Sequence, residues 1–182
     1  MDTNIRSHLD AIQSSDKDAQ GAAFQALMVA ANVPVGWAYE AWDELVAALQ
    51  HKNNHTRAIA AQVLCNLAKS DPRKKIVKDV KALLAVTKDE RFVTARHCMQ
   101  SLWKVGVAGD EQKAALMKGL SARFQECIAE KNCTLIRHDI LESMRKVYEA
   151  APDESIRKRA GELIATEEDA KYQKKYWALW KK

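Results

Sequence analysis

The side chains best suited to catalysis or metal binding are four cysteines and five histidines, and they form no familiar reactive pattern. No two cysteines have the C-x-x-C spacing of a zinc or redox site. The nearest collection of metal ligands is His97, Cys98, Cys127, Cys133 and His138. Its first two members point in different directions on a helix, and the other spacings fit no zinc pattern. The sequence also has no Gly-rich phosphate loop, nucleophile elbow or His-Glu-x-x-His motif. We therefore expect no metal, no cofactor and no catalysis.

The cysteines instead suggest unpaired thiols in a reducing compartment. Three of the four lie among apolar residues, where a thiol behaves as a small hydrophobe, and a chain of 182 residues needs no disulfide for stability. The first residues do not form a signal peptide, and no apolar run approaches the roughly 20 residues that cross a bilayer. We expect a cytoplasmic protein without membrane contact.

The composition favours an all-α fold. Only 6 glycines and 3 prolines occur, so tight hairpins must be few. The residues that dominate, such as Ala, Leu, Lys, Glu and Gln, are good helix formers. With 47% hydrophobic and 29% charged residues, the chain has the composition of a packed globular protein.

Charge is distributed unevenly along the chain. Residues 1–51 carry 2 basic and 7 acidic side chains, a balance of −5, whereas residues 52–182 carry 27 and 17, a balance of +10. One interpretation is a positive surface that attracts an acidic peptide or nucleic acid. The other is a solvated surface, since lysines and glutamates are interspersed.

Apolar residues recur with a long period. Four stripes have the i, i+4, i+7, i+8 spacing of one helix face, with Arg123 as the exception. They are Ala38-Trp42-Leu45-Val46, Ile76-Val80-Leu83-Leu84, Leu116-Leu120-Arg123-Phe124 and Ile156-Ala160-Leu163-Ile164. Their starting points are 38, 40 and 40 residues apart, which indicates a repeat.

A second set of stripes lies between the first, with i, i+4, i+7 spacing. Its members are Phe24-Met28-Ala31, Ala60-Leu64-Leu67, Met99-Trp103-Gly106 and Ile140-Met144-Val147. Three residues before them stand Gly21, Arg57, Arg96 and Arg137. Two alternating stripes predict a repeated helix pair.

The segments Glu44–Leu49 and Arg57–Leu64 resemble the HEAT repeat, a helix–turn–helix unit with an arginine early in its second helix. The resemblance covers residues 3–165. It implies a right-handed α-solenoid of about five stacked antiparallel helix pairs, in which second helices line the concave side. The acidic turn residue of the family occurs only at Asp89-Glu90, so a complete Asp–Arg ladder between repeats is not implied.

We predict one domain over residues 1–182. Its pairs are 3–13 with 16–31, 37–51 with 54–69, 72–87 with 90–106, 110–129 with 132–150, and a capping pair of 153–165 with 167–181. Ser70-Asp71-Pro72 suggests a helix cap with proline in the first turn, and Thr166 suggests another helix start. No pair can bury its apolar face alone, so each must stack on its neighbours.

The concave surface is the expected binding site. We predict that it carries Ala22, Ala26 and Val29 near the N-terminus, followed by Ala58, Gln62 and Cys65. The candidate partner-binding residues are Gln62, Asn66, His97, Gln100, Ser101, Lys104, His138, Glu142 and Arg145. The recurring arginines Arg57, Arg96 and Arg137 are expected to be structural, bonding carbonyls or carboxylates of the adjacent turn.

The aromatic and basic residues 171–182 have two interpretations. The first is a terminal cap, because Tyr172, Tyr176 and Trp180 share a helix face that could cover the last repeat. The second is a helix that binds nucleic acid or a membrane surface.

We therefore predict a non-catalytic scaffold that recognises a protein or peptide, possibly an acidic one. The alternative is nucleic-acid binding through the basic C-terminal two-thirds, with strong salt dependence. A third hypothesis, a helical-repeat DNA glycosylase, would need Trp103, Asp139 and Arg145 to surround a damaged base.

Overall fold

The computed structural model describes residues 1–181, so Lys182, the last residue of the aromatic and basic segment, lies outside the described residues. The protein is all-α, with no strand among residues 1–181. The helices are α1 (Thr3–Ala11), α2 (Lys17–Ala30), α3 (Ala38–Ala48), α4 (Asn54–Leu67), α5 (Lys75–Val86), α6 (Phe92–Ser101), α7 (Trp103–Gly106), α8 (Asp110–Glu126), α9 (Cys133–Ala150), α10 (Glu154–Ala165) and α11 (Ala170–Leu179). Short 3-10 turns, η1 (Ala68–Ser70) and η2 (Cys127–Ala129), extend α4 and α8.

Every predicted helix is present, with ends shifted by a few residues. The predicted helix 90–106 is divided at Leu102 into α6 and α7. Helix α5 begins at Lys75 rather than Pro72, after Lys74 in the left-handed region with φ of 56°. The N-cap position is therefore Lys74 and not the predicted Asp71. Asp71 still satisfies one free amide of the first turn, because its Oδ2 accepts from the Ile76 N–H at 2.7 Å. Helix α11 is capped by Asp169 and not by Thr166.

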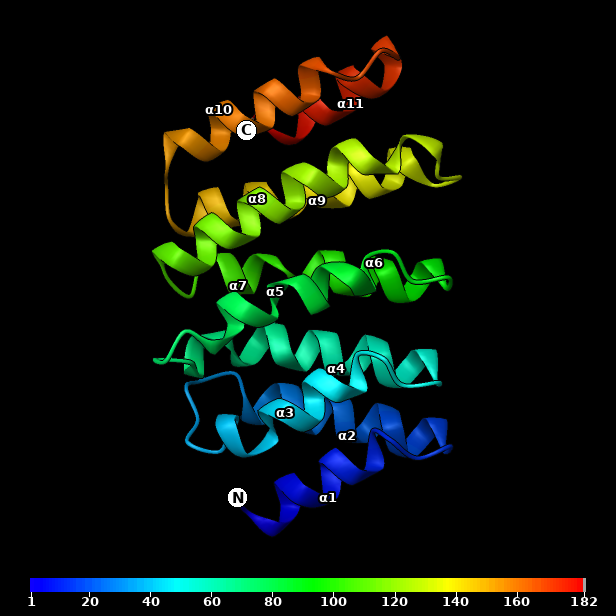
Figure 1. Cartoon of the computed structure of the whole chain (residues 1–182), viewed down its shortest axis with the longest axis vertical. Coiled ribbons are helices and arrows are strands. Elements are labelled where there is room, and N and C mark those ends of the chain that lie inside the picture. Colours follow the sequence, from blue (N-terminus) through cyan, green and yellow to red (C-terminus); the bar gives the residue numbers. More distant parts are fainter. Residues whose placement is uncertain (182) are drawn as a thin grey trace.

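The helix pairs stack in chain order along the long axis, with the two termini at opposite ends (Figure 1). Along one row α2 packs on α4, α4 on α6, α6 on α9, and α9 on α11. In the other row α5 packs on α8 and α8 on α10. Second helices of successive pairs are therefore direct neighbours. No helix among the described residues is long and apolar enough to cross a membrane.

The predicted stripes form most of the core. Trp42, Leu64, Met99, Leu120 and Ile140 all have no exposed surface. Two residues of the predicted stripe in α2 were misplaced by one position, since Ala23 and Leu27 are buried while Phe24 and Met28 are only partly covered. Ala31, the third member of the stripe, is buried as predicted. The cause of the shift is Gln20, one turn earlier, whose buried amide donates to the carbonyl of Ile12 and to Thr56 Oγ1 and thereby fixes the rotation of α2.

Two sequence features behave differently from expectation. Arg123, the exception in its stripe, is 2% exposed and binds Glu130 and the carbonyl of Thr87. The prediction of unpaired cysteines was wrong for one pair, because Cys127 and Cys133 form a disulfide. The η2 turn between them brings their Cα atoms to 5.1 Å. Cys65 and Cys98 are free and buried.

Candidate partner-binding face

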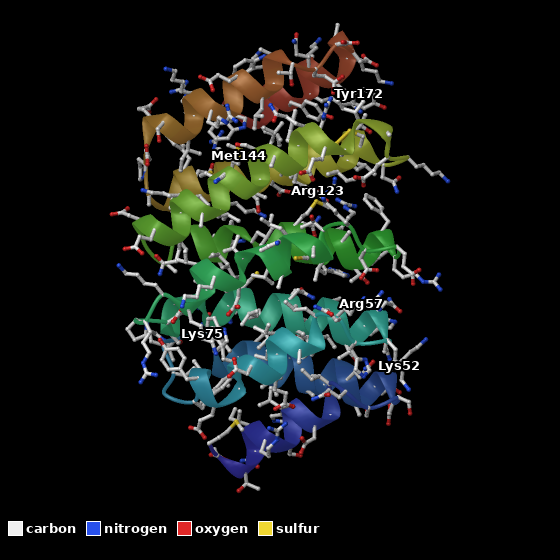
Figure 2. All side chains as sticks on the ribbon, viewed as in Figure 1. Lys52, Arg57, Lys75, Arg123, Met144 and Tyr172 are labelled. Atoms are coloured by element: carbon white, nitrogen blue, oxygen red, sulfur yellow. A yellow bond between two sulfur atoms is a disulfide. The ribbon has the colours of Figure 1, made fainter. Side chains whose placement is uncertain are left out.

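The candidate binding surface is the second-helix face, defined as the outward-facing residues of α2, α4, α6, α7, α9 and α11. Figure 2 shows side chains along the whole stack, with Arg57 on α4 and Met144 on α9 among those labelled. These helices are consecutive neighbours, so their outward-facing residues lie along one side of the stack.

The N-terminal part of this face is small and apolar. Ala22 and Val29 are exposed on α2, and Ala26 is half-buried. Val29 is 75% exposed, and Val33, just after the helix, is 62% exposed. Val29 and Val33 are four residues apart, and together they present an uncharged apolar surface to a partner.

The predicted exposure of residues in α4 is mostly wrong. Ala58, Cys65 and Asn66 are buried, and only Gln62 keeps partial exposure. Helix α4 packs against α2, α3 and α6, as well as α5 and α7, so little of its circumference reaches solvent. Gln62 donates to the carbonyl of Ala58 on its own helix.

Asn66 is a structural residue that also positions a lysine. Its side-chain amide donates to the carbonyl of Ala31 at 2.9 Å, which joins α4 to the end of α2. Its Oδ1 accepts from Lys104 Nζ at 3.1 Å. Burial lowers the pKa of Lys104, and the nearby charge of Lys69 lowers it further. Lys104 is thus a half-buried cation held at the centre of the face.

The α6 residues divide between surface and interior. His97 is exposed, whereas Ser101 is buried and donates to the His97 carbonyl at 2.9 Å. Gln100 is half-buried and donates weakly to Asp139 Oδ1 at 3.4 Å. Of these three predicted residues, only His97 is readily available to a partner.

On α9, His138, Glu142 and Arg145 are half-buried. Arg145 donates to Glu149 Oε1 at 2.8 Å and to the carbonyl of Leu179, while Glu142 pairs with Lys146 at 3.2 Å. Arg145 therefore joins α9 to the end of α11.

One cluster could offer ligands to a cation. His138, Asp139 and Glu142 present ligand atoms within 4.8 Å of one another. However, Asp139 is fully buried and accepts two hydrogen bonds from Arg96, at 2.7 and 3.0 Å. A metal ion would lie against the Arg96 guanidinium, so we assign the cluster to structure.

The pKa of Asp139 reflects this environment. Burial raises it, but interactions with His138 and Arg96 outweigh burial and leave the pKa below its ordinary value. A fully buried carboxylate already paired in this way is also unsuited to the role that a DNA glycosylase would require. Trp103, the aromatic partner in that hypothesis, packs partly buried against the core.

The recurring arginines tie the second, third and fourth pairs each to the next one. Arg57 binds Asp89 at 2.6 and 2.8 Å and the carbonyl of His51 at 2.8 Å. Arg137 binds Glu167 at 2.8 Å and the carbonyl of Phe124 at 3.2 Å. Together with Arg96 and Asp139, they give three links between pairs. Sequence reasoning missed Asp139 because it lies inside α9 and not in a turn. It also missed Glu167, although this residue lies in the turn between α10 and α11, as Asp89 lies in the turn between α5 and α6.

The aromatic residues of α11 largely cover the preceding pair. Tyr176 is 1% exposed and donates to the carbonyl of Thr134 on α9 at 2.9 Å, and Trp180 is also buried. These contacts support the interpretation of α11 as a cap. Trp177 of the same helix, in contrast, is 40% exposed.

The comparisons with known proteins are limited to the fold. No protein-family model matches the sequence, and no curated protein does. The structure is similar to two crystal structures of engineered proteins from the Northeast Structural Genomics Consortium. One is 18% identical with a TM-score of 0.55, and the match covers 97% of this chain and 77% of that one. The other is 17% identical with a TM-score of 0.54 and 98% coverage, and this chain spans about half of its length, 47%. Such a likeness concerns the helical fold alone.

Proposed function

We propose that this protein is a HEAT-like right-handed α-solenoid that binds a protein or peptide through the second-helix face, without catalysis. The observation that carries the proposal is the unbroken row of second helices from α2 to α11. In a stack of this kind the row forms a long surface on which an extended partner contacts several repeats.

The chemistry along this face changes from end to end. It begins with exposed Ala22 and Val29 and continues to His97, Lys104 and the half-buried polar residues of α9. A peptide with an apolar segment followed by an acidic one would match this order. We propose a cytoplasmic partner of this composition.

Nucleic-acid binding is less well supported by the arrangement of charges. Several cations of the basic two-thirds are paired with acids of a neighbouring helix pair, such as Lys74 with Glu111 and Lys88 with Glu126, both at 2.6 Å. Interspersed carboxylates would repel a phosphate backbone. The hypothesis predicts affinity for RNA or DNA that falls steeply with salt, which gel-shift titrations would detect.

Site-specific photo-crosslinking tests the proposal. A photoreactive amino acid in place of exposed His97 should crosslink to a specific polypeptide in cell extract. The same group in place of Lys78 should not, because Lys78 is exposed on α5, the first helix of its pair. Lys104→Glu should reduce the crosslink at position 97 about tenfold, while Lys78→Glu should not change it. Equal labelling from both positions, or a product that nuclease removes, would contradict a peptide-binding second-helix face.

A further inference from the structure

A pocket of about 440 Å³ lies at the C-terminal end of the stack. Three helices or their ends supply its lining, which consists of Arg145 and Tyr148 of α9, Arg157 of α10, and Trp177, Trp180 and Lys181 at the end of α11. Arg145 was predicted to lie on the concave binding surface, and Arg157 was not predicted as a site residue. The two meet only because α10 and α11 fold against α9.

Among the described residues, the lining is cationic and aromatic, with no acidic side chain. The Arg145 guanidinium lies 5.8 Å from the centre of the Trp180 ring, within range of a cation–π interaction. Arg157 and Lys181 are exposed at the edge. An anionic group that entered would meet donors from several directions.

A second observation concerns the indole N–H of Trp180, a residue that lines the pocket. Trp180 is 6% exposed, and its indole Nε1–H is buried with no hydrogen-bond partner among residues 1–181. A buried donor without a partner costs about 1–3 kcal/mol, and most such groups are satisfied. A ligand with an accessible oxygen acceptor could remove this cost after a small movement of the pocket lining.

The surroundings favour a single anionic group over a strand of phosphates. Glu149 binds Arg145, and Glu154 accepts from the Tyr148 hydroxyl at 2.7 Å, so carboxylates border the pocket on α9 and α10. A continuous nucleic-acid backbone would meet these acids. Trp, Tyr and Arg together are also the residues that dominate the energetics of protein interfaces.

We propose that this pocket anchors an acidic side chain of a peptide partner. The carboxylate would accept from Arg157, Lys181 and the Trp180 indole, while the neighbouring residue of the peptide packs on the exposed face of Trp177. The proposal rests on the peptide-binding function above and deepens it, because it assigns the acidic part of the partner to the C-terminal end of the stack, where residues of α9 and of the end of α11 meet Arg157 of α10.

Selection of random dodecapeptides displayed on phage, with the full chain as target, tests this assignment. The enriched peptides should carry Asp or Glu beside an apolar or aromatic residue. Synthetic copies should lose about tenfold or more in affinity for Arg157→Glu and for Trp177→Ala, measured by fluorescence polarisation. Lys158→Glu is the matched control, since Lys158 is exposed on the same helix, is not part of the pocket, and undergoes the same change of sign. Circular dichroism of each variant establishes that it is folded.

The outcomes separate this proposal from the broader one. Enriched peptides that lack acidic residues, or that bind Arg157→Glu as well as the original protein, overturn the pocket assignment and leave peptide binding intact. Failure to enrich any peptide overturns both. Oligo-dT that binds tightly and is weakened by Arg157→Glu but not by Lys158→Glu would show a nucleic-acid site instead, and would also overturn the proposal.

Discussion

Helices α4 and α11 occupy equivalent places in their pairs but differ greatly in burial. Ten of the fourteen residues of α4 are buried, whereas Tyr176 is the one buried residue among the ten of α11. Helix α4 has neighbours on both sides along the stack, and α11 packs on α9 and α10 alone among the described helices with substantial contact. Burial in such a stack is therefore decided by the number of neighbours more than by the pattern of the helix itself.

The largest expected effect is the loss of stability when a large side chain is removed from α4, compared with the same kind of change in α11. Leu64→Ala in α4 removes a side chain with no exposed surface and should lower the free energy of unfolding by about 2–5 kcal/mol. Trp177→Ala in α11 should cost about 1 kcal/mol or less, because the side chain is 40% exposed. Urea denaturation followed by circular dichroism measures both. Equal losses would mean that the middle and the end of the stack are equally packed.

A somewhat smaller loss is expected from breaking a link between pairs. Arg96→Met leaves the fully buried Asp139 carboxylate without its main partner, so we expect a loss of about 2–3 kcal/mol. The double variant Arg96→Met/Asp139→Leu removes both charges and should be more stable than Arg96→Met alone. If the double variant were the less stable of the two, the ion pair would not be the source of the effect.

Asn66 and Gln62 provide a closer comparison within α4. Asn66→Ala removes the hydrogen bond to the Ala31 carbonyl and should cost about 1–2 kcal/mol. Gln62→Ala should change stability by less than about 0.5 kcal/mol, because Gln62 bonds only the carbonyl one turn before it. Thermal unfolding of the two variants ranks them, and a larger loss for Gln62→Ala would contradict the structural role of Asn66.

The smallest effect concerns pH. The pKa values of Asp89 and Asp139 lie below their ordinary values, because pairing with Arg57, or with His138 and Arg96, outweighs burial. Their stabilisation is complete above the unfolded pKa of about 3.9 and is lost as the pH falls through the lower folded values. Urea midpoints should therefore decrease below about pH 4. The double variant Asp89→Asn/Asp139→Asn should be less stable at pH 7, but its free energy of unfolding should fall by about 1 kcal/mol less between pH 7 and acid pH than that of the original protein. An equal fall would assign the acid sensitivity to other groups.

The helices and most of the core could be predicted from sequence because each stripe repeats within one helix. The spacing of residues such as Ile76 and Val80 depends on helix geometry alone. The rotation of α2 could not be predicted, since it depends on Gln20 reaching Thr56 in the next pair. The Cys127–Cys133 disulfide likewise depends on the path of the η2 turn.

The candidate site was harder to predict, because exposure depends on helices that are distant in sequence. Asn66 and Ser101 have polar side chains at positions that a single amphipathic helix would expose, yet adjacent helices bury both. His97 remains exposed as expected. The pocket of Arg157 and Trp177 requires three helices at once, and no spacing in the sequence indicates it.

The arginine links between successive pairs also limit how far a disturbance reaches. Among residues 1–181, hydrogen bonds that join different pairs span at most 44 positions, as between Ser143 and the carbonyl of Met99. The first pair can therefore fray in thermal fluctuations without breaking a hydrogen bond held by the last. A disturbance at one end can reach the other only by way of each intervening interface between pairs.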